Sequence, residues 1–316
     1  MHGKLDRAPL SSPVGELTVV VLNWGSPELT IRCVRSLLGD GVPPSRVVVV
    51  DNGSEDDSYG QFQAEFPDCV LLRIEQNVGF ARAANAGARL LPGEAYLFVD
   101  NDAFVHRPGS VDALLRCLSD ESVGIVMARI LSEDLTLQET VHPIQTPAVA
   151  PVLWTGLSRL LPNRWQPVWG RHWDHSDSRE IAAAAGVVML VRGALWDELG
   201  GYPEDAVVYA EDIDMCWRAR RRGSKVWFTS AAEFLHLGSA TIVRDSDRAR
   251  RAELIGRAEA AMTLRNLSRP SAFLVLTTKA GGLGVRWLFL RVTRREAESA
   301  IAKAELRGTL HPVRNR

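Results

Sequence analysis

The stretch Tyr96-Leu97-Phe98-Val99-Asp100-Asn101-Asp102 places four apolar residues, rich in strand formers, directly before two carboxylates one residue apart. Such an apolar run predicts a strand that is buried on both faces of a sheet. In an open α/β sheet, ligands bind in the crevice outside the carboxyl ends of the strands, so Asp100 and Asp102 are predicted to lie at a site. The alternative is a plain turn, since Asp and Asn also favour turns.

The two carboxylates also suggest what the site binds. Carboxylate oxygens at this spacing suit magnesium or manganese, ions that keep several waters and bridge to the phosphates of a substrate. The pattern therefore favours a divalent metal, Mg²⁺ or Mn²⁺, and a substrate that carries a diphosphate.

The chain before this stretch alternates between strand and helix patterns. Apolar, largely β-branched runs at 17–22, 47–50 and 70–74 predict three more buried strands, and the spacing of apolar residues predicts helices between them. Strand-helix-strand units of this length are parallel, so their carboxyl ends lie at one edge of the sheet. The sequence thus predicts an α/β fold, with a mainly parallel sheet flanked by helices.

Polar residues follow these other strands as well. Asp51 ends the second strand, where it would bind a base or ribose or would simply cap a turn or helix. Gly79 is predicted to begin a helix whose free N–H groups, together with Arg82, suit an anion. Small residues at Ala81 and Ala84 would let this helix pack closely on the sheet.

Four motifs follow one another as they do in family-two glycosyltransferases: Leu22-Asn23-Trp24, Val50-Asp51-Asn52-Gly53-Ser54, Asn77-Val78-Gly79-Phe80 with Asn85, and Phe98-Val99-Asp100-Asn101-Asp102. The chain resembles this family over roughly residues 17–240, and most of all the branch that contains the bacterial rhamnosyltransferases. The resemblance implies an A-type glycosyltransferase fold and a metal held by Asp100 and Asp102. It also implies a set of residues that bind the nucleotide sugar: Asn23, Asp51, Asn77, Gly79, Arg82, Asn85 and Asp100.

A second acidic stretch is Tyr209-Ala210-Glu211-Asp212-Ile213-Asp214. Acids in the first turn of a helix are favoured by the helix dipole, so capping alone would explain them. The resemblance implies more, because these residues match the family's acceptor-site motif. In that motif Asp212 corresponds to the catalytic base, with Glu211 and Asp214 beside it.

A lone histidine, His236, is of interest for the same reason. It lies where relatives have a His-containing motif that completes the metal or diphosphate site. The plainer interpretation is a core histidine with satisfied hydrogen bonds.

The segment 135–179 shows little periodicity and several prolines. A loop of this length favours a lid or an acceptor-binding flap, in which tryptophans stack on sugar rings. A small apolar core under the loop is the alternative, and we do not interpret the two histidines as metal ligands. The residues concerned are Trp154, Trp165, Trp169, Trp173, His172 and His175.

Charge and composition limit which functions and which domain divisions are plausible for this chain. The 316 residues are 46% hydrophobic with a net charge of −1, which argues against a generic nucleic-acid binder, yet residues 244–316 carry a net charge of +9. We expect a disordered lead-in at 1–15, a catalytic domain at 16–243 and a basic helical region at 244–316. The nucleotide-sugar half of the catalytic domain would be 16–110, and the acceptor half 111–243.

No signal-peptide pattern begins the chain, and no two of the four cysteines form a close pair, so we expect a cytoplasmic protein with reduced, buried cysteines. The apolar segment 272–292 is interrupted by charges and glycines and is interpreted as too broken to span a membrane. It would either rest on the inner face of the plasma membrane or pack against the catalytic domain.

The expected reaction is transfer of a sugar from a nucleoside diphosphate sugar to the hydroxyl of a glycan or lipid-linked acceptor, metal-dependent and with inversion. From the resemblance, dTDP-rhamnose is the first choice of donor, and galactofuranose or another hexose the second. The process would be the synthesis of cell-surface polysaccharide or glycolipid. The rivals are an inactive nucleotide-sugar-binding protein and a sugar-nucleotide pyrophosphorylase, although no glycine- and basic-rich loop follows the first strand.

Overall fold

The computed structural model describes residues 16–157, 173–204, 210–238 and 245–312. The first part of the chain alternates strands and helices as predicted. Its elements are β1 (Leu17–Asn23), α1 (Pro27–Gly39), the short helix η1 (Pro44–Arg46), β2 (Val47–Asn52), α2 (Ser58–Glu65), β3 (Val70–Ile74), α3 (Phe80–Leu90) and β4 (Ala95–Asp100). Strands β3, β2, β1 and β4 pair in this order, all parallel, which confirms the predicted parallel arrangement.

The second part of the chain extends the same sheet. Its elements are β5 (Ala103–Val105), α4 (Ser110–Cys117), β6 (Val123–Leu131), β7 (Val141–His142), α5 (Val149–Trp154), β8 (Arg179–Ile181), β9 (Ala183–Ala184), β10 (Val188–Arg192), α6 (Gly193–Leu199), α7 (Glu211–Arg221) and β11 (Lys225–His236). The sheet order is β3-β2-β1-β4-β10-β6-β11-β5, with β8 also on β11. Strand β10 runs antiparallel to both neighbours, so it joins the strands of the two halves.

The sheet is covered on both faces, as the apolar runs predicted. Alternate residues of β1 enter two separate cores: Val19 and Val21 pack with α1, whereas Val20 packs with α3. Fully burying one such side chain contributes about 1.5–3 kcal/mol. The predicted close approach of α3 is confirmed, because a Cβ on Gly87 would lie 2.8 Å from a methyl group of Val20.

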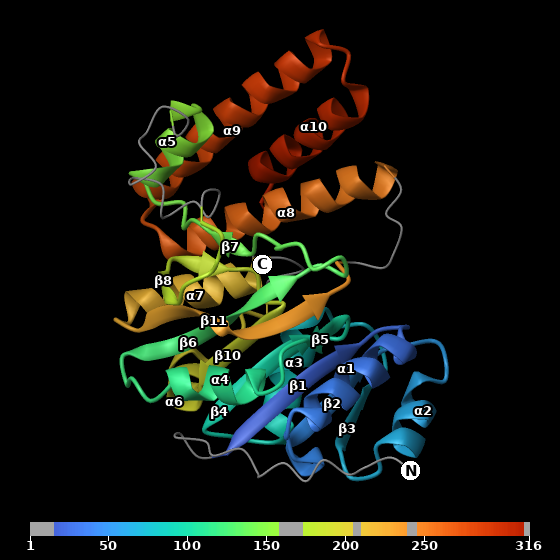
Figure 1. Cartoon of the computed structure of the whole chain (residues 1–316). Coiled ribbons are helices and arrows are strands. Elements are labelled where there is room, and N and C mark those ends of the chain that lie inside the picture. The colour runs from blue at the N-terminus through green and yellow to red at the C-terminus, as the bar shows by residue number, and fades with distance from the viewer. Residues whose placement is uncertain (1–15, 158–172, 205–209, 239–244, 313–316) are drawn as a thin grey trace.

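The C-terminal region is helical, as expected, with α8 (Asp245–Asn266), α9 (Arg269–Val292) and α10 (Glu296–Leu310). Figure 1 shows these helices together at the top of the molecule, with α5 beside α9. Lys279 of α9 is buried between two glutamates, Glu259 of α8 and Glu305 of α10, and its Nζ lies 3.3 Å from an oxygen of Glu305. This ion cluster ties the helices together, and the boundary we expect at 243/244 stays a prediction.

One sequence-based expectation about this region is wrong. The segment 272–292 is not broken by its glycines and charges but lies within the continuous 24-residue helix α9. Among the described residues α9 is the one helix long and apolar enough to cross a membrane by length and composition. Glycine costs only about 1 kcal/mol in a helix, and the packing of α9 on its neighbours offsets that cost.

Candidate active site

Two carboxylates and a histidine meet at the carboxyl end of β4. The chain turns at Asp100 and Asp102 into β5, which pairs antiparallel with the end of β11, and this pairing sets His236 opposite Ala103. His236 Nε2 lies 3.2 Å from Asp102 Oδ1. One ligand atom from each of Asp100, Asp102 and His236 lies within 4.8 Å of the other two, so the structure brings the predicted metal ligands together.

Gln138 fixes the orientation of the His236 ring. Its side-chain Nε2 donates to the His236 carbonyl oxygen (2.7 Å), and its Oε1 lies 2.8 Å from His236 Nδ1. Because an amide oxygen only accepts, Nδ1 must carry a proton. His236 Nε2, which faces the Asp102 carboxylate, therefore needs either a second proton or a cation.

The pKa shifts of His236 and Asp100 agree with a positive charge at His236 Nε2. Burial works to lower the pKa of His236, but its hydrogen bond to Asp102 and the charges of Asp102 and Asp100 outweigh it and raise the pKa. Burial raises the pKa of Asp100 to about 7, opposed by His236 and reinforced by Asp102 and Asp212. Two acids and an imidazole this close favour a cation among them.

A second acidic group begins α7. Ala210, the residue before the helix, has a φ of 68°, the left-handed region that costs an L-residue about 1–2 kcal/mol. The helix then starts with Glu211 and Asp212 in its first turn. Strained backbone of this kind is often found at functional sites.

Asp212 is held by backbone N–H groups. Its Oδ2 accepts from Gly186 (2.6 Å) and its Oδ1 from Ile213 (2.7 Å). A Cβ on Gly186 would lie 2.9 Å from the Cβ of Asp212, so glycine is needed for this approach. The next residue, Val187, accepts the Asp100 N–H through its carbonyl (2.9 Å). The adjacent residues Gly186 and Val187 thus connect Asp212 with Asp100.

Both acids at the start of α7 are harder to ionise than usual. Burial raises the pKa of Asp212, against the two backbone hydrogen bonds that favour its charged form. Burial raises the pKa of Glu211 too, and the charges of Asp212 and Asp100 add to this. Oε2 of Glu211 is buried and has no hydrogen-bond partner among the described residues. A buried polar atom without a partner is uncommon and marks this position as a candidate for function.

Asp214, the third acid of the motif, lies in other surroundings. Only 1% exposed, it accepts hydrogen bonds from Arg218 Nε (2.8 Å) and Asn266 Nδ2 (2.5 Å), and Arg265 lies 3.2 Å away. Its oxygens therefore join α7 to α8, and the structure does not bring it into the group formed by Glu211 and Asp212.

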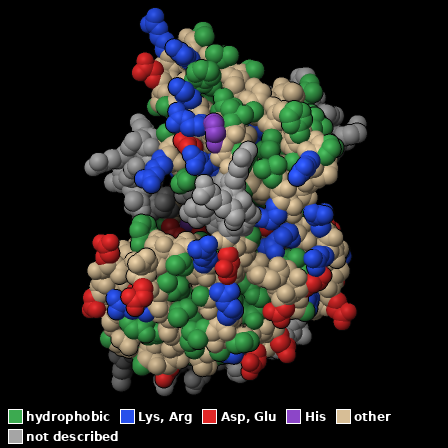
Figure 2. Space-filling model, turned by 180° about the vertical axis from the view of Figure 1, so that it is seen from behind, with side chains coloured by type: hydrophobic (Ala, Val, Ile, Leu, Met, Phe, Trp, Pro, Cys, Tyr) green, Lys and Arg blue, Asp and Glu red, His purple; other side chains and the backbone are tan. Residues whose placement is uncertain are grey.

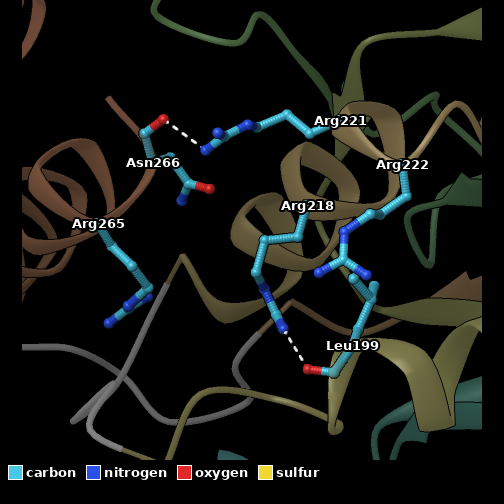
Figure 3. A pocket seen from close by; sticks show the side chains of 6 residues that line it. All are labelled: Leu199, Arg218, Arg221, Arg222, Arg265 and Asn266. Atoms are coloured by element: carbon cyan, nitrogen blue, oxygen red, sulfur yellow. Dashed lines mark hydrogen bonds between the residues drawn. The ribbon is translucent and has the colours of Figure 1, made fainter. Parts of the chain in front are cut away.

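Figure 3 shows the basic pocket beside Asp214, which has a volume of about 320 Å³. Arg218 donates to the Leu199 carbonyl (2.9 Å) and Arg221 to the Asn266 carbonyl (2.8 Å). These arginines therefore supply hydrogen bonds to carbonyl groups at the C-terminal ends of α6 and α8. They lie in the last turns of α7, whereas Glu211 and Asp212 lie in the first. The pocket is lined by Leu199, Arg218, Arg221, Arg222, Arg265 and Asn266.

Asn23 and Asp51, which the resemblance assigned to nucleotide-sugar binding, form a buried network at the ends of β1 and β2. The Asn23 amide donates to Asp51 (3.2 Å) and Ser54 (2.9 Å), and it accepts from Thr30 (2.8 Å). Ser26 N–H fills its remaining acceptor position at 3.3 Å. Asn23 is 0% exposed with its donors and acceptors used inside the protein, and its role in nucleotide-sugar binding stays a prediction. The alternative of Asp51 as a helix cap is wrong, because α2 begins at Ser58.

Asn77 and Gly79 shape the loop before α3. The Asn77 Oδ1 accepts from the Gly79 N–H (2.9 Å) and from Asn52 (3.2 Å). Gly79 precedes the helix with a φ of 84°, which confirms it as the residue that opens α3.

Arg82 and Asn85 of α3 form hydrogen bonds with residues that follow α6. The Asn85 amide is buried and exchanges two hydrogen bonds with the backbone of Tyr202, at 2.8 and 2.9 Å. Arg82 Nε donates to the Glu204 carbonyl at 3.1 Å. Asn85 therefore joins α3 to the turn after α6, while roles of either residue in donor binding stay predictions.

The tryptophans of the loop region pack within the protein where the structure describes them. Trp154 donates to Gln145 (3.0 Å) and lies so close to α9 that a Cβ on Gly282 would meet its carbonyl oxygen at 2.4 Å. Trp173 stacks on His175 at 4.2 Å between ring centroids. Trp173 packs on the apolar core beside Phe228, as the apolar-core alternative requires, whereas Trp154 packs against α9. Trp165, Trp169 and His172 lie outside the described residues.

Sequence reasoning missed two residues of the site. Gly186 had a usable signal, because an isolated glycine within an apolar, strand-like run indicates close approach by another group. Gln138 had none, since it lies in an aperiodic segment and meets His236 only through the pairing of distant strands.

Together, a mainly parallel sheet, a carboxylate-histidine group at the end of β4 and an acid pair on α7 define the class of A-type, nucleotide-sugar-dependent glycosyltransferases. Residues 18–194 match the model of glycosyl transferase family 2, and the chain belongs to that family. The resemblance seen in the sequence is therefore confirmed.

The relatives agree with the rhamnosyltransferase-like branch. The N-acetylglucosaminyl-diphospho-decaprenol L-rhamnosyltransferase of Mycobacterium tuberculosis is 26% identical over 72% of this chain and 78% of its own length. The pre-mycofactocin glycosyltransferase of that organism is 27% identical over 90% of this chain and 55% of its own length. A mannosyltransferase from Pyrobaculum calidifontis, solved with GDP-Man and Mn²⁺, shares the fold with a TM-score of 0.58 at 17% identity, over 96% of this chain and 89% of its own.

Proposed function

We propose that this glycosyltransferase moves rhamnose from dTDP-rhamnose to a hydroxyl of a lipid-linked glycan, with inversion and with the help of a divalent metal. The rhamnose and the lipid-linked acceptor are supported by the name of the mycobacterial N-acetylglucosaminyl-diphospho-decaprenol L-rhamnosyltransferase. The dTDP carrier is taken from the resemblance described in the sequence analysis. The protein would then work in the cytoplasm, in the synthesis of a cell-surface glycan.

The observation that carries this proposal is the link between Asp212 and Asp100. The Gly186 N–H holds the Asp212 carboxylate, and the Val187 carbonyl holds the Asp100 backbone. A candidate base on the acceptor side and a candidate metal ligand on the donor side are therefore fixed to one strand connection. A direct displacement with inversion needs this juxtaposition, because the base and the metal must flank one sugar, with the acceptor oxygen opposite the leaving diphosphate at the anomeric carbon.

Asp100, Asp102 and His236 fit a divalent cation, because their ligand atoms converge and His236 Nε2 faces Asp102 with Nδ1 held by Gln138. A metal bound there supplies Lewis-acid stabilisation of charge on the diphosphate leaving group. Both Mg²⁺ and Mn²⁺ suit two carboxylates, and the imidazole ligand is better suited to Mn²⁺.

The chain's own residues would handle the proton. Asp212 would take the proton of the acceptor hydroxyl as that oxygen attacks the anomeric carbon. Glu211 would orient the same hydroxyl through its unpartnered Oε2. A single base is enough for a single displacement, which supports inversion.

The test is nucleoside diphosphate release from a panel of nucleotide sugars with Mg²⁺ or Mn²⁺, with and without a synthetic N-acetylglucosaminyl-diphospho-polyprenol. We expect dTDP-rhamnose to be turned over and the acceptor to raise the rate. Faster release from another donor would replace the donor assignment. Formation of a nucleoside triphosphate from pyrophosphate, or donor binding with no turnover, would support the pyrophosphorylase or the inactive protein instead.

Gln138→Ala should weaken metal binding without removing a ligand. Loss of the hydrogen bond to Nδ1 frees the His236 ring, and removing such supporting groups typically costs about 10–100-fold in metal affinity. The measurement is Mn²⁺ titration of the protein with nucleoside diphosphate present. Gln145→Ala, which removes an amide that bonds Trp154 instead, is the matched control. Equal Mn²⁺ affinity in both variants would remove Gln138 from the site.

A further inference from the structure

Helix α9 presents an apolar face to the outside of the molecule. Six of the large hydrophobic side chains that are exposed in the described part of the chain lie on this one helix, among them Phe273 (71% exposed), Val285 (70%) and Phe289 (61%). The others are Leu274, Leu288 and Val292. At 100° per residue, these side chains and the small residues between them follow one side of the helix. Contiguous exposed apolar surface of this kind indicates an interaction site.

The opposite side of α9 is committed to the protein. Val275, Lys279 and Leu283 are buried there, and Lys279 pairs with the two glutamates from α8 and α10. Gly282 lets the helix approach Trp154 of α5. If α9 crossed a bilayer, this ion cluster would enter hydrocarbon, where charged groups are costly. The helix is therefore suited to lie along a surface with one face in contact.

The charged side chains of α9 itself are all basic. The segment 269–292 contains no Asp or Glu. Arg269, Arg286 and Arg291 are exposed, and Arg291 lies on the same side of the helix as Phe273. Figure 2 shows hydrophobic and basic side chains next to one another over the upper part of the molecule, where Figure 1 places the C-terminal helices. Apolar side chains rimmed by arginines suit an anionic lipid surface.

A second copy of the chain fits this face less well. A two-fold contact that sets the two α9 helices antiparallel would bring Arg269 of one copy opposite Arg291 of the other, and a parallel contact would set each arginine opposite itself. No acid of α9 would offset these like charges.

We propose that the outward face of α9 seats the protein on an anionic membrane surface. The apolar side chains would enter the boundary between headgroups and acyl chains, and the arginines would contact lipid phosphates. The alternative that these residues pack against the catalytic domain is wrong for Phe273, Leu274, Leu288 and Phe289, which are exposed, whereas Leu290 is buried. The proposal does not rest on the donor or the acceptor proposed above.

The test is co-sedimentation of the full chain with vesicles of phosphatidylcholine alone or with phosphatidylglycerol added. We expect binding to the anionic vesicles, weakened by salt. A Val285→Ser/Phe289→Ser variant should bind at least about tenfold more weakly, because both apolar contacts are lost. Arg286→Gln/Arg291→Gln should lose most of the preference for anionic lipid. Leu90→Ser, which removes an exposed leucine of α3, is the matched control and should bind like wild type.

Three outcomes would overturn the proposal: no vesicle binding, binding that is equal in the Val285/Phe289 variant and wild type, or dimerisation that this variant abolishes while vesicles have no effect. If that variant does not fold, as judged by its melting curve, the arginine variant and the salt dependence carry the test. Nucleoside diphosphate release with a soluble acceptor analogue is measured alongside. The α9 variants should keep it, which separates a failure of membrane binding from a failure of the proposed reaction.

Discussion

Asp212→Asn should lower kcat by about 10²–10⁴-fold, the range expected for loss of a general base, while the donor Kd stays within a few-fold of wild type. The amide keeps the shape of the carboxylate but cannot take the acceptor proton. The substitution should also lower the stability of the protein. Asp212 accepts from two N–H groups, of Gly186 and Ile213, and an amide can accept from only one of them. We therefore expect about 1 kcal/mol of destabilisation as well.

The measurement is steady-state kinetics at saturating donor and metal, with a melting curve for each variant. Asp112→Asn, a change on the surface of α4, is the matched control. If Asp212→Asn keeps turnover within a few-fold of wild type, the base lies elsewhere. Glu211 is then next in line, because Asp214 already has its oxygens bonded to Arg218 and Asn266.

The pH dependence of kcat gives an independent check on the same residue. A base works only when ionised, and burial raises the pKa of Asp212 above that of an ordinary aspartate. Activity should therefore fall with decreasing pH at a higher pH than an exposed aspartate would give. The residual activity of Asp212→Asn should lack this acidic limb. Saturating metal keeps the ionisation of Asp100 out of the profile, because a bound cation favours its charged form.

The sequence predicted the parts of this site that depend on strand ends. Asp51, Asp100 and Asp102 follow apolar runs, and parallel strands deliver such residues to one edge whatever the details of packing. His236 and Asp212 could be placed there only through the resemblance to the family. Their meeting with Asp100 depends on β5 pairing with β11 and on β10 entering between β4 and β6. Pairings between such distant segments leave no periodic signal in the chain.

The sequence did not show the internal hydrogen bonds of three predicted site residues. Asn23, Asn85 and Asp214 have the polarity of ligand-binding groups, yet each is buried with its hydrogen bonds made inside the protein. A sequence shows that a residue is polar but does not show how many of its donors and acceptors the fold itself uses. The same limit applies to α9, where the pattern gave an apolar segment but not which side of it would be covered.

Asp102→Ala should abolish the metal dependence of donor binding. In the wild type we expect nucleoside diphosphate to bind more tightly when Mn²⁺ is added, because the cation offsets charge between the diphosphate and the acids. The variant removes one of three converging ligands and the partner of His236 Nε2. The measurement is calorimetry of nucleoside diphosphate binding with and without Mn²⁺. The affinity should be the same under both conditions in Asp102→Ala but should differ between them in the wild type. Asp112→Ala is the control and should show the same difference as the wild type.

A readout that needs neither metal nor turnover distinguishes loss of the site from loss of the fold. The hydrogen bond and charge of Asp102 help to raise the pKa of His236, so the imidazole of Asp102→Ala should titrate at a lower pH than in the wild type, as followed by NMR. The loss of Mn²⁺ affinity should also exceed that of Gln138→Ala, because a missing ligand costs more than a missing support. An unchanged imidazole pKa together with unchanged metal dependence would show that Asp102 does not face His236 in solution, and the metal centre would have to be sought at other acids.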